Sequence, residues 1–186
     1  MAIDRTFEQQ YSLDIAMLVP GKQAESFSLD RAFFEHFDFG LSQDGNVKAE
    51  LEIVRYPQHF DVVFHIKGNV KVECDRCLEP YDQPIDSTNR IIYSYDPNQQ
   101  FEDTEVIQIN EEDSEIPVAQ DLYDFVHVSL PLRRVPSKKI HICDPSVLAV
   151  LGLDANGKPL PKEESEDDID PRWEALKKLK DSEENS

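Results

Sequence analysis

The sequence predicts an α+β domain built on an antiparallel β-sheet that can curl into a barrel-like form, with one packed helix and a short C-terminal helix. Several short segments in the centre of the chain alternate apolar and polar residues, the pattern of half-buried strands. A later segment has apolar residues at helical spacing. Strands at this spacing favour a sheet that curls on itself. With 186 residues, the chain has room for one ordinary domain plus tails.

The N-terminal part of the sequence predicts two strands and a brief helix. Apolar residues alternate over Tyr11–Val19, which indicates a first strand that Pro20 ends. A short strand is expected around Ser26–Leu29. Asp30 follows and can cap a brief helix that carries several aromatic residues.

The central part has the clearest strand pattern. Apolar and polar residues alternate over residues 47–53 and again over residues 60–66. Gly68-Asn69 then has the chemistry of a two-residue hairpin turn, so a return strand is expected to follow. By parity, this return strand places Cys74 on the core side at its end.

Two further strands and the packed helix come next. Residues 91–95 and residues 105–109 are expected to be strands. The helix begins with Pro117 in its first turn and stops at Ser129-Leu130-Pro131. Its expected buried face consists of Ala119, Leu122, Tyr123 and Val126.

The C-terminal part becomes polar and acidic, which is the composition of a linker. We therefore expect a single α+β domain over residues 1–152, an acidic flexible linker over 153–170, a short amphipathic helix over 171–180 and a disordered tail over 181–186. An Asp-Pro pair begins the short helix as N-cap and first residue. Trp173 lies on its apolar side and must pack against something, because so short a helix is unstable alone.

The formal net charge is −19, so the average surface repels nucleic acid and attracts basic proteins. Solubility alone is an equally good account of the excess carboxylates. The charge reverses locally at Arg133, Arg134, Lys138 and Lys139, with no acid among them. This stretch either meets phosphates or is a solvated loop that balances nearby acids.

Several function classes are not indicated by the sequence. No stretch approaches the ~20 apolar residues of a membrane span, and the first residues do not have the form of a signal peptide, so a cytoplasmic location without membrane contact is expected. There is no phosphate-cradling glycine loop, and no histidine stands at triad spacing from a nucleophile. We therefore expect neither an enzyme nor a small-molecule substrate.

The three cysteines offer a candidate zinc site. Cys74 and Cys77 are separated by two residues, and His141 and Cys143 form the only plausible second pair for a tetrahedral ion. The alternative is that Cys74 packs in the core and the other thiols have no role. A redox pair is a further alternative, in which Arg76 stabilises a thiolate, although such pairs normally open a helix in a βαβ unit.

Three segments together resemble the bacterial YceD family. Residues 72–78 resemble its Cys-x-Arg-Cys signature, and residues 130–143 resemble its Leu-Pro…Pro…His…Cys segment. Residues 170–179 resemble its closing helix. The resemblance implies a role in the synthesis, processing or stability of large-subunit ribosomal RNA during ribosome assembly, and it implies no catalytic activity.

The sequence thus favours a non-enzymatic factor for the accumulation of large-subunit ribosomal RNA. Its expected partner is a basic ribosomal protein or a large-subunit rRNA assembly intermediate. The alternatives are a thiol-redox protein that uses Cys74 and Cys77, and a zinc-stabilised adaptor unrelated to ribosomes. The residues expected to contact RNA or the partner are Arg76, Arg133, Arg134, Lys138, Lys139 and Trp173.

Overall fold

The computed structural model describes residues 6–37, 40, 42, 44–102, 104–154 and 157–160. The chain divides into two compact units, residues 1–143 and residues 144–186. The linker, short helix and tail expected near the C-terminus lie, from residue 161 onward, outside the described residues. In the second unit, Asp144 is the N-cap of α4 (Pro145–Val150), and its carboxylate accepts a hydrogen bond from the backbone N–H of Ser146.

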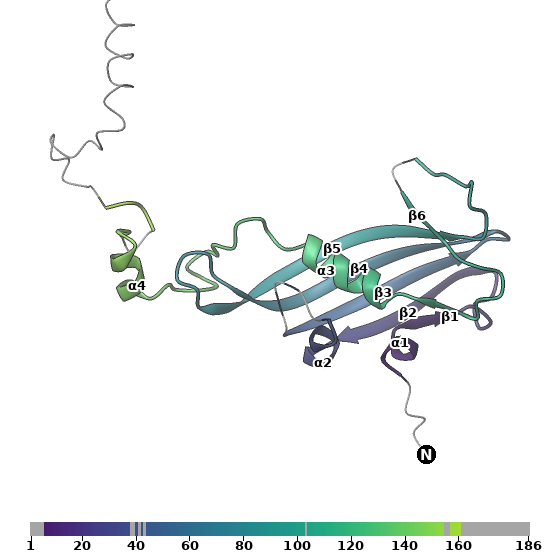
Figure 1. Ribbon diagram of the computed structural model, residues 1–186, viewed down its shortest axis with the longest axis horizontal. Coiled ribbons are helices and arrows are strands. Elements are labelled where there is room, and N and C mark those ends of the chain that lie inside the picture. The colour runs from purple at the N-terminus through teal and green to yellow at the C-terminus, as the bar shows by residue number, and fades with distance from the viewer. Residues whose placement is uncertain are drawn as a thin grey trace, which may run out of the picture. The chain divides into compact units, whose positions relative to one another are not determined.

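The first unit is built on a five-stranded sheet with the order β2-β3-β4-β5-β6 (Figure 1). Neighbouring strands from β2 to β5 are antiparallel, whereas β6 pairs with β5 in parallel. A second, two-stranded sheet joins β1 to β7. The strands are β1 (Ser12–Asp14), β2 (Gly21–Leu29), β3 (Gly45–Arg55), β4 (His59–Glu73), β5 (Pro80–Ser94), β6 (Glu105–Gln108) and β7 (Glu115–Pro117).

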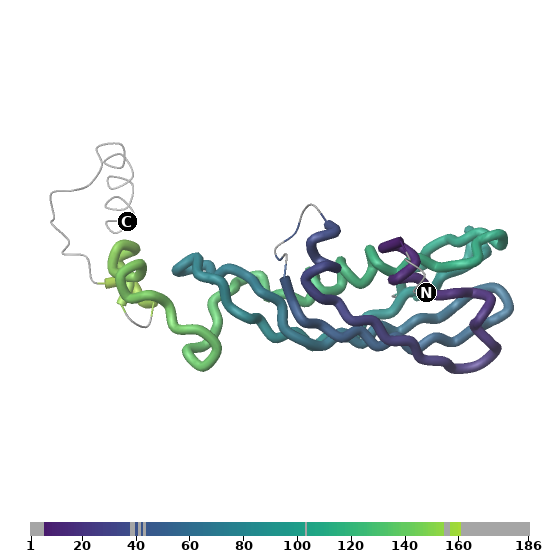
Figure 2. The backbone as a smooth tube through the Cα atoms, turned by 90° about the horizontal axis from the view of Figure 1, so that it is seen from below, coloured from purple at the N-terminus to yellow at the C-terminus, as the bar shows by residue number. Residues whose placement is uncertain are grey.

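Three helices lie on the same side of the large sheet: α1 (Phe7–Gln10), α2 (Arg31–Glu35) and α3 (Ala119–Val128) (Figure 2). The expected buried face of α3 is confirmed. Its Phe125 ring packs against Phe64 of β4, with 5.1 Å between ring centroids. The expected Asp30 cap of α2 is also confirmed, because its carboxylate accepts a hydrogen bond from the backbone N–H of Phe33. Pro117 does not open α3 but ends β7.

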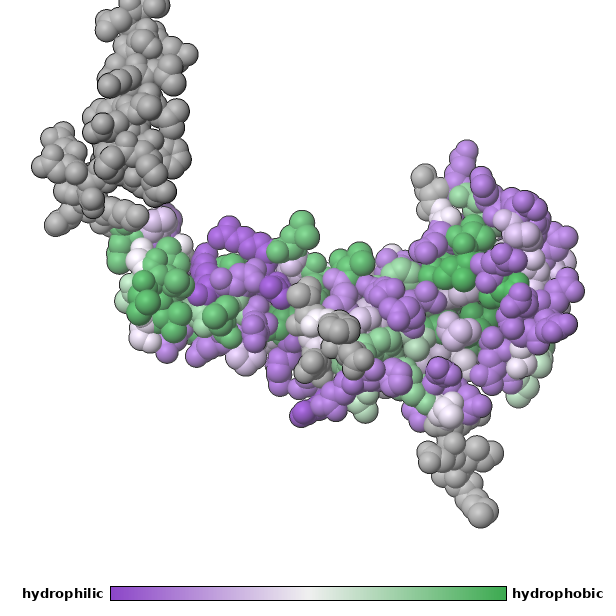
Figure 3. Space-filling model, viewed as in Figure 1, coloured by the Kyte–Doolittle hydropathy of each residue, from purple (hydrophilic) through white to green (hydrophobic). Residues whose placement is uncertain are grey.

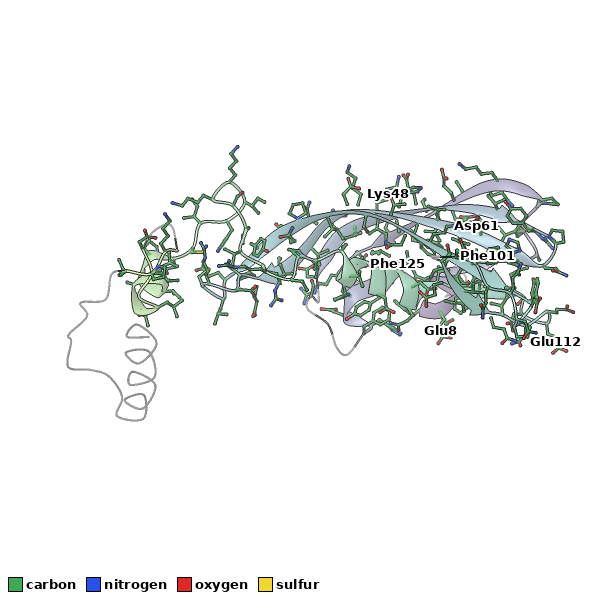
Figure 4. The ribbon with its side chains drawn as sticks, turned by 90° about the horizontal axis from the view of Figure 1, so that it is seen from above. Glu8, Lys48, Asp61, Phe101, Glu112 and Phe125 are labelled. Carbon is green, nitrogen blue, oxygen red and sulfur yellow. The ribbon has the colours of Figure 1, made fainter. Side chains whose placement is uncertain are left out.

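The two faces of the sheet differ as strict alternation requires. The side chains that face the helices form the core, among them Leu51, Ile53, Phe60, Val62 and Phe64. The opposite face, termed the open face here, carries charged side chains such as Lys48 and Asp61, whereas Phe125 lies on the helix side (Figure 4). Ion pairs cross the strands on the open face, including Lys67–Asp86 and Arg90–Asp61.

The sheet is open, so the expectation of a barrel-like form is not met. The two edge strands are β2 and β6, and no pairing joins them in the described part of the chain. Closure is prevented because β6 is only four residues long. In addition, α3 and the β1–β7 pair occupy the side that a closed sheet would fill with its own side chains.

The first strand is shorter than the alternation over Tyr11–Val19 predicts. It ends at Asp14, whose carboxylate accepts hydrogen bonds from the backbone N–H groups of Ala16 and Met17. This local turn competes with the extended conformation. It leaves Met17 exposed, so the prediction of a strand up to Val19 is wrong.

The hairpin turn predicted at Gly68-Asn69 is also wrong, because β4 runs without interruption from His59 to Glu73. Glycine is needed at position 68 for a different reason. A Cβ there would lie 2.3 Å from the carbonyl oxygen of Asn46 and 2.6 Å from the Cα of Val47. Gly68 therefore marks a close approach of β3 to β4, and the chain reverses instead between Glu73 and Pro80.

No helix among the described residues is long and apolar enough to cross a membrane.

Candidate functional site

The reversal between β4 and β5 places two cysteines in one tight turn. The backbone N–H of Leu78 donates to the carbonyl of Cys74 at 2.9 Å, and the N–H of Cys74 donates to the carbonyl of Glu79 at 3.0 Å. Leu78 has a φ of 61°, which is uncommon for a residue with a side chain. The turn thereby brings Cys77 back beside Cys74, and the side chains of both cysteines are buried. The expected core-side position of Cys74 is confirmed.

A second segment, residues 131–143, lies along this turn and is termed the basic segment. Asp75 and Arg134 join the two: the N–H of Asp75 donates to the carbonyl of Arg134 at 3.0 Å, and the N–H of Arg134 donates to the Asp75 carboxylate at 2.7 Å. The Arg134 guanidinium donates to the same carboxylate at 2.9 and 3.2 Å. The backbone N–H of Arg134, together with the guanidinium, lowers the pKa of Asp75 below its usual value.

The basic segment brings His141 and Cys143 to the two cysteines of the turn. The ligand atoms of Cys74, Cys77, His141 and Cys143 all lie within 4.8 Å of one another, and these residues are termed the Cys/His cluster. Nε2 of His141 lies 3.0 Å from Sγ of Cys77, and the sulfur atoms of Cys74 and Cys143 are 3.8 Å apart. The Tyr81 ring stacks on His141, with 5.6 Å between centroids, and fixes its orientation. The four residues that the sequence pairs as a candidate site therefore converge in space.

The donor set and spacing of the Cys/His cluster fit a tetrahedral zinc ion. Three thiolates and one imidazole are a common structural zinc set, and bond lengths of about 2.0–2.3 Å place ligand atoms roughly 3.5–3.8 Å apart. The observed separations require only small adjustments to reach this geometry. Two of the four ligands are buried in the turn, and the Tyr81 ring contacts a third.

The pKa values of Cys74 and Cys143 are shifted in opposite directions. Burial raises the pKa of Cys74, but hydrogen bonds from the backbone N–H groups of Cys77 and Arg76, together with those of the Cys143 and Cys77 side chains, leave the pKa below its usual value. Burial raises the pKa of Cys143, and its hydrogen bonds with Cys77 and Cys74 raise it further. A bound cation would favour the thiolate at all three positions.

The geometry does not favour a redox role for Cys74 and Cys77. Reactive thiols are partly exposed, whereas these two side chains are 0% and 6% exposed. They lie in a β-hairpin turn rather than at the start of a helix, so no helix N-terminus stabilises a thiolate.

The cations expected to contact RNA or a partner have different surroundings. Arg133, Lys138 and Lys139 are exposed in the basic segment, and Arg76 is half-buried in the turn. Arg134 is engaged with Asp75, so its first role is to hold the basic segment to the turn. Trp173 lies outside the described residues.

Exposed aliphatic side chains surround the Cys/His cluster, and the sequence argument did not identify them. They are Leu78, Leu132, Ile140 and Ile142. Figure 3 shows hydrophobic groups that interrupt the hydrophilic surface in this part of the unit. The alternation of side chains could have identified two of them. In an extended segment whose residues 141 and 143 face the cluster, residues 140 and 142 point to the opposite side.

A family model described as large ribosomal RNA subunit accumulation protein YceD matches residues 62–180. The matched region contains all four residues of the Cys/His cluster and the whole basic segment. No curated protein and no solved structure matches the chain.

Proposed function

Because the chain belongs to the YceD family of large ribosomal RNA subunit accumulation proteins, we propose that it is a non-enzymatic factor that supports the accumulation of large-subunit ribosomal RNA in the cytoplasm. The family match carries this proposal. The match includes the turn and the basic segment, so these parts of the first unit are the ones that we assign to the function.

The role that we assign to the Cys/His cluster is structural. Cys74, Cys77, His141 and Cys143 would hold one zinc ion, which supplies a cross-link between the β4–β5 turn and a segment 64 residues away. Such an ion stabilises only the conformation in which all four ligands converge, so its binding free energy becomes folding free energy of this part of the unit. The Asp75–Arg134 contacts reinforce the same arrangement.

The ordered basic segment is the surface that we assign to RNA contact. Arg133, Lys138 and Lys139 are exposed there in a protein whose formal net charge is −19. Naked RNA should bind weakly, with a shallow salt dependence, because the four cations of the segment can make at most about four phosphate contacts.

A basic ribosomal protein is the partner that fits the rest of the unit. The connection between β6 and β7 exposes Glu111, Glu112 and Asp113, and Glu112 lies at the end of the sheet opposite the β4–β5 turn (Figure 4). Carboxylates clustered in this way attract a cationic partner and raise its rate of association. The two ends of the sheet would then contact components of opposite charge in one assembly intermediate.

Deletion of the gene tests the proposal. Cells without the protein should contain less large-subunit than small-subunit ribosomal RNA, and the wild-type gene should restore the ratio. Arg133→Glu should restore it only in part, whereas Lys67→Glu, the same charge reversal on the open face, should restore it fully. An unchanged ratio after deletion, in conditions where the protein is made, contradicts the proposal.

A further inference from the structure

The outer edge of β2 presents backbone groups without a hydrogen-bond partner in the described part of the chain. β2 is nine residues long and pairs with β3 along its whole length, from Gly21–Arg55 to Leu29–Val47. The backbone N–H of Tyr56 donates to His59 in the turn to β4, so the even-numbered residues of β3 bond to β4 and the odd-numbered ones to β2.

The same alternation determines which groups of β2 point outward. Odd-numbered residues of β2 bond to β3, so the N–H and C=O groups of Lys22, Ala24, Ser26 and Ser28 point away from the sheet. The Tyr11 hydroxyl confirms this direction, because it donates to the carbonyl of Ser28 from outside the sheet. The remaining outward groups, those of Lys22, Ala24 and Ser26, form an open ladder edge.

This edge has little protection against strand addition. Natural sheets protect their edges with prolines, bulges, lysines or very short strands. β2 has nine residues, contains no proline and carries Lys22 as its single lysine. The outward positions at its middle, Ala24 and Ser26, have small side chains that leave the backbone accessible.

The open face beside the edge carries charged side chains of both signs. A hollow of about 410 Å³ lies on the open face, next to Ala24 and Ser26. Of its lining carboxylates, Glu50 and Glu52 lie on the open face, where they pair with Lys48 at 2.6 Å and with Lys22 at 2.8 Å. Glu25, opposite Leu51 of β3, points to the helix side. In an added strand, the side chains opposite Ala24 and Ser26 would lie on the open face over this hollow. The formal net charge of −19 makes cationic side chains the favoured occupants of these positions.

We propose that β2 accepts an extended, lysine- or arginine-rich segment of a partner protein as a sixth strand of the sheet. The proposal rests on the basic protein partner assigned above and specifies how that partner binds. RNA cannot supply the peptide N–H and C=O groups that the edge requires. A second copy of the chain could supply them, but it brings another formal charge of −19, whereas a basic segment is attracted.

Proline substitutions distinguish the outward N–H groups of β2 from those that bond to β3. Ala24→Pro removes only an outward N–H, so the β2–β3 ladder remains, and Ser26→Pro tests the same edge independently. Glu25→Pro is the matched control for the inner ladder, because it removes an N–H that bonds to β3. We expect a large fall in melting temperature for Glu25→Pro and a small one for the two outward variants.

The binding probe is a fluorescent peptide of about ten residues in which lysine and threonine alternate, titrated into the full chain. A control peptide of equal charge has proline in place of each threonine and cannot form a ladder. The Lys-Thr peptide should bind more tightly than the control peptide. Ala24→Pro should raise the Kd of the Lys-Thr peptide at least about tenfold without changing that of the control. Amide exchange at Lys22, Ala24 and Ser26 should slow when the Lys-Thr peptide binds.

Two outcomes overturn the proposal. If the chain binds the two peptides with equal affinity, strand addition at β2 is ruled out. The same holds if wild type and both outward variants bind the Lys-Thr peptide equally. A dimer in sedimentation that Ala24→Pro dissociates assigns the edge to a second copy instead. The peptide assay contains no ribosomal component, so its failure leaves the RNA ratio after gene deletion as a separate test of the proposed function.

Discussion

Removal of zinc should disorder the basic segment while the sheet stays folded. None of residues 131–143, all of which are described, is fully buried, so the apolar packing of this segment is limited. Leu130, which precedes it, is buried and anchors its start to the sheet. Contacts that hold the segment include those of Asp75 with Arg134, the stacking of Tyr81 on His141 and those within the Cys/His cluster.

The magnitudes show why these contacts need the metal. Ordering the backbone costs about 1 kcal/mol per residue at the low end, or on the order of 13 kcal/mol for residues 131–143. Asp75 is exposed, so solvent weakens its hydrogen bonds with Arg134, and they offset only part of this cost. A structural zinc ion contributes an apparent free energy of about 10–16 kcal/mol. We therefore expect the segment to be ordered when zinc is bound and disordered without it.

Hydrogen exchange followed by NMR measures this directly. A chelator, or the substitution Cys143→Ser, should remove the protection of the N–H groups of Asp75 and Arg134, which bond between the turn and the segment. The N–H groups of Leu51 and Ile53 in β3 should stay protected, because the sheet and α3 do not depend on the cluster. Retained protection at Asp75 after complete chelation refutes the reasoning, and so does unfolding of the whole sheet.

Three further predictions concern the fold itself. Leu122→Ala should lower the free energy of unfolding by about 2–5 kcal/mol, because Leu122 is fully buried on the core-facing side of α3, whereas Leu132→Ala at a fully exposed position should leave it nearly unchanged in urea denaturation. Gly68→Ala should lower it by about 1–3 kcal/mol, since the new Cβ meets backbone atoms of β3. Burial raises the pKa of Asp121 to about 6, so the folded state binds this proton more tightly than the unfolded state. Stability should consequently fall as the pH rises from about 4 to about 6, by on the order of 1–2 kcal/mol after allowance for solvent screening, and Asp121→Asn should not show this fall.

Each of these predictions has an outcome that contradicts it. Equal losses in Leu122→Ala and Leu132→Ala would show that α3 is not packed as described. A Gly68→Ala protein as stable as wild type would remove the close approach of β3 to β4. Parallel pH profiles for wild type and Asp121→Asn would show that Asp121 titrates alike in the folded and unfolded states.

Patterns within one element predicted local structure well. The alternation over residues 47–53 and 60–66 identified β3 and β4, and the apolar spacing of α3 identified its buried face. These patterns succeed because burial of one face determines the identity of every second residue in a strand, and of every third or fourth in a helix. Parity also placed Cys74 correctly, since β4 keeps the same alternation up to its end.

Features that depend on distant parts of the chain were not predictable in this way. Gly68 has the sequence pattern of a turn, but its role is set by β3, which passes close to it. The parallel pairing of β6 with β5 and the pairing of Leu13 with Ile116 leave no local pattern. The Asp75–Arg134 contacts likewise join residues far apart in sequence.

The candidate site was predictable in its residues but not in its surroundings. Cysteine and histidine are uncommon enough that Cys74, Cys77, His141 and Cys143 stood out as two pairs, and these pairs do converge. Arginine is common at surfaces, so the sequence could not distinguish Arg134, which holds the basic segment, from Arg133, which is exposed.

The most direct test of whether the Cys/His cluster supports the function uses cells whose only copy of the gene carries Cys143→Ser. The quantity measured is the ratio of large-subunit to small-subunit ribosomal RNA. The purified variant should contain no stoichiometric zinc and should keep its folded sheet, so a change in the ratio would report the cluster and not general unfolding. The account predicts a ratio as low as that after gene deletion. A ratio equal to that of wild-type cells, with the variant present at wild-type amounts, would contradict it.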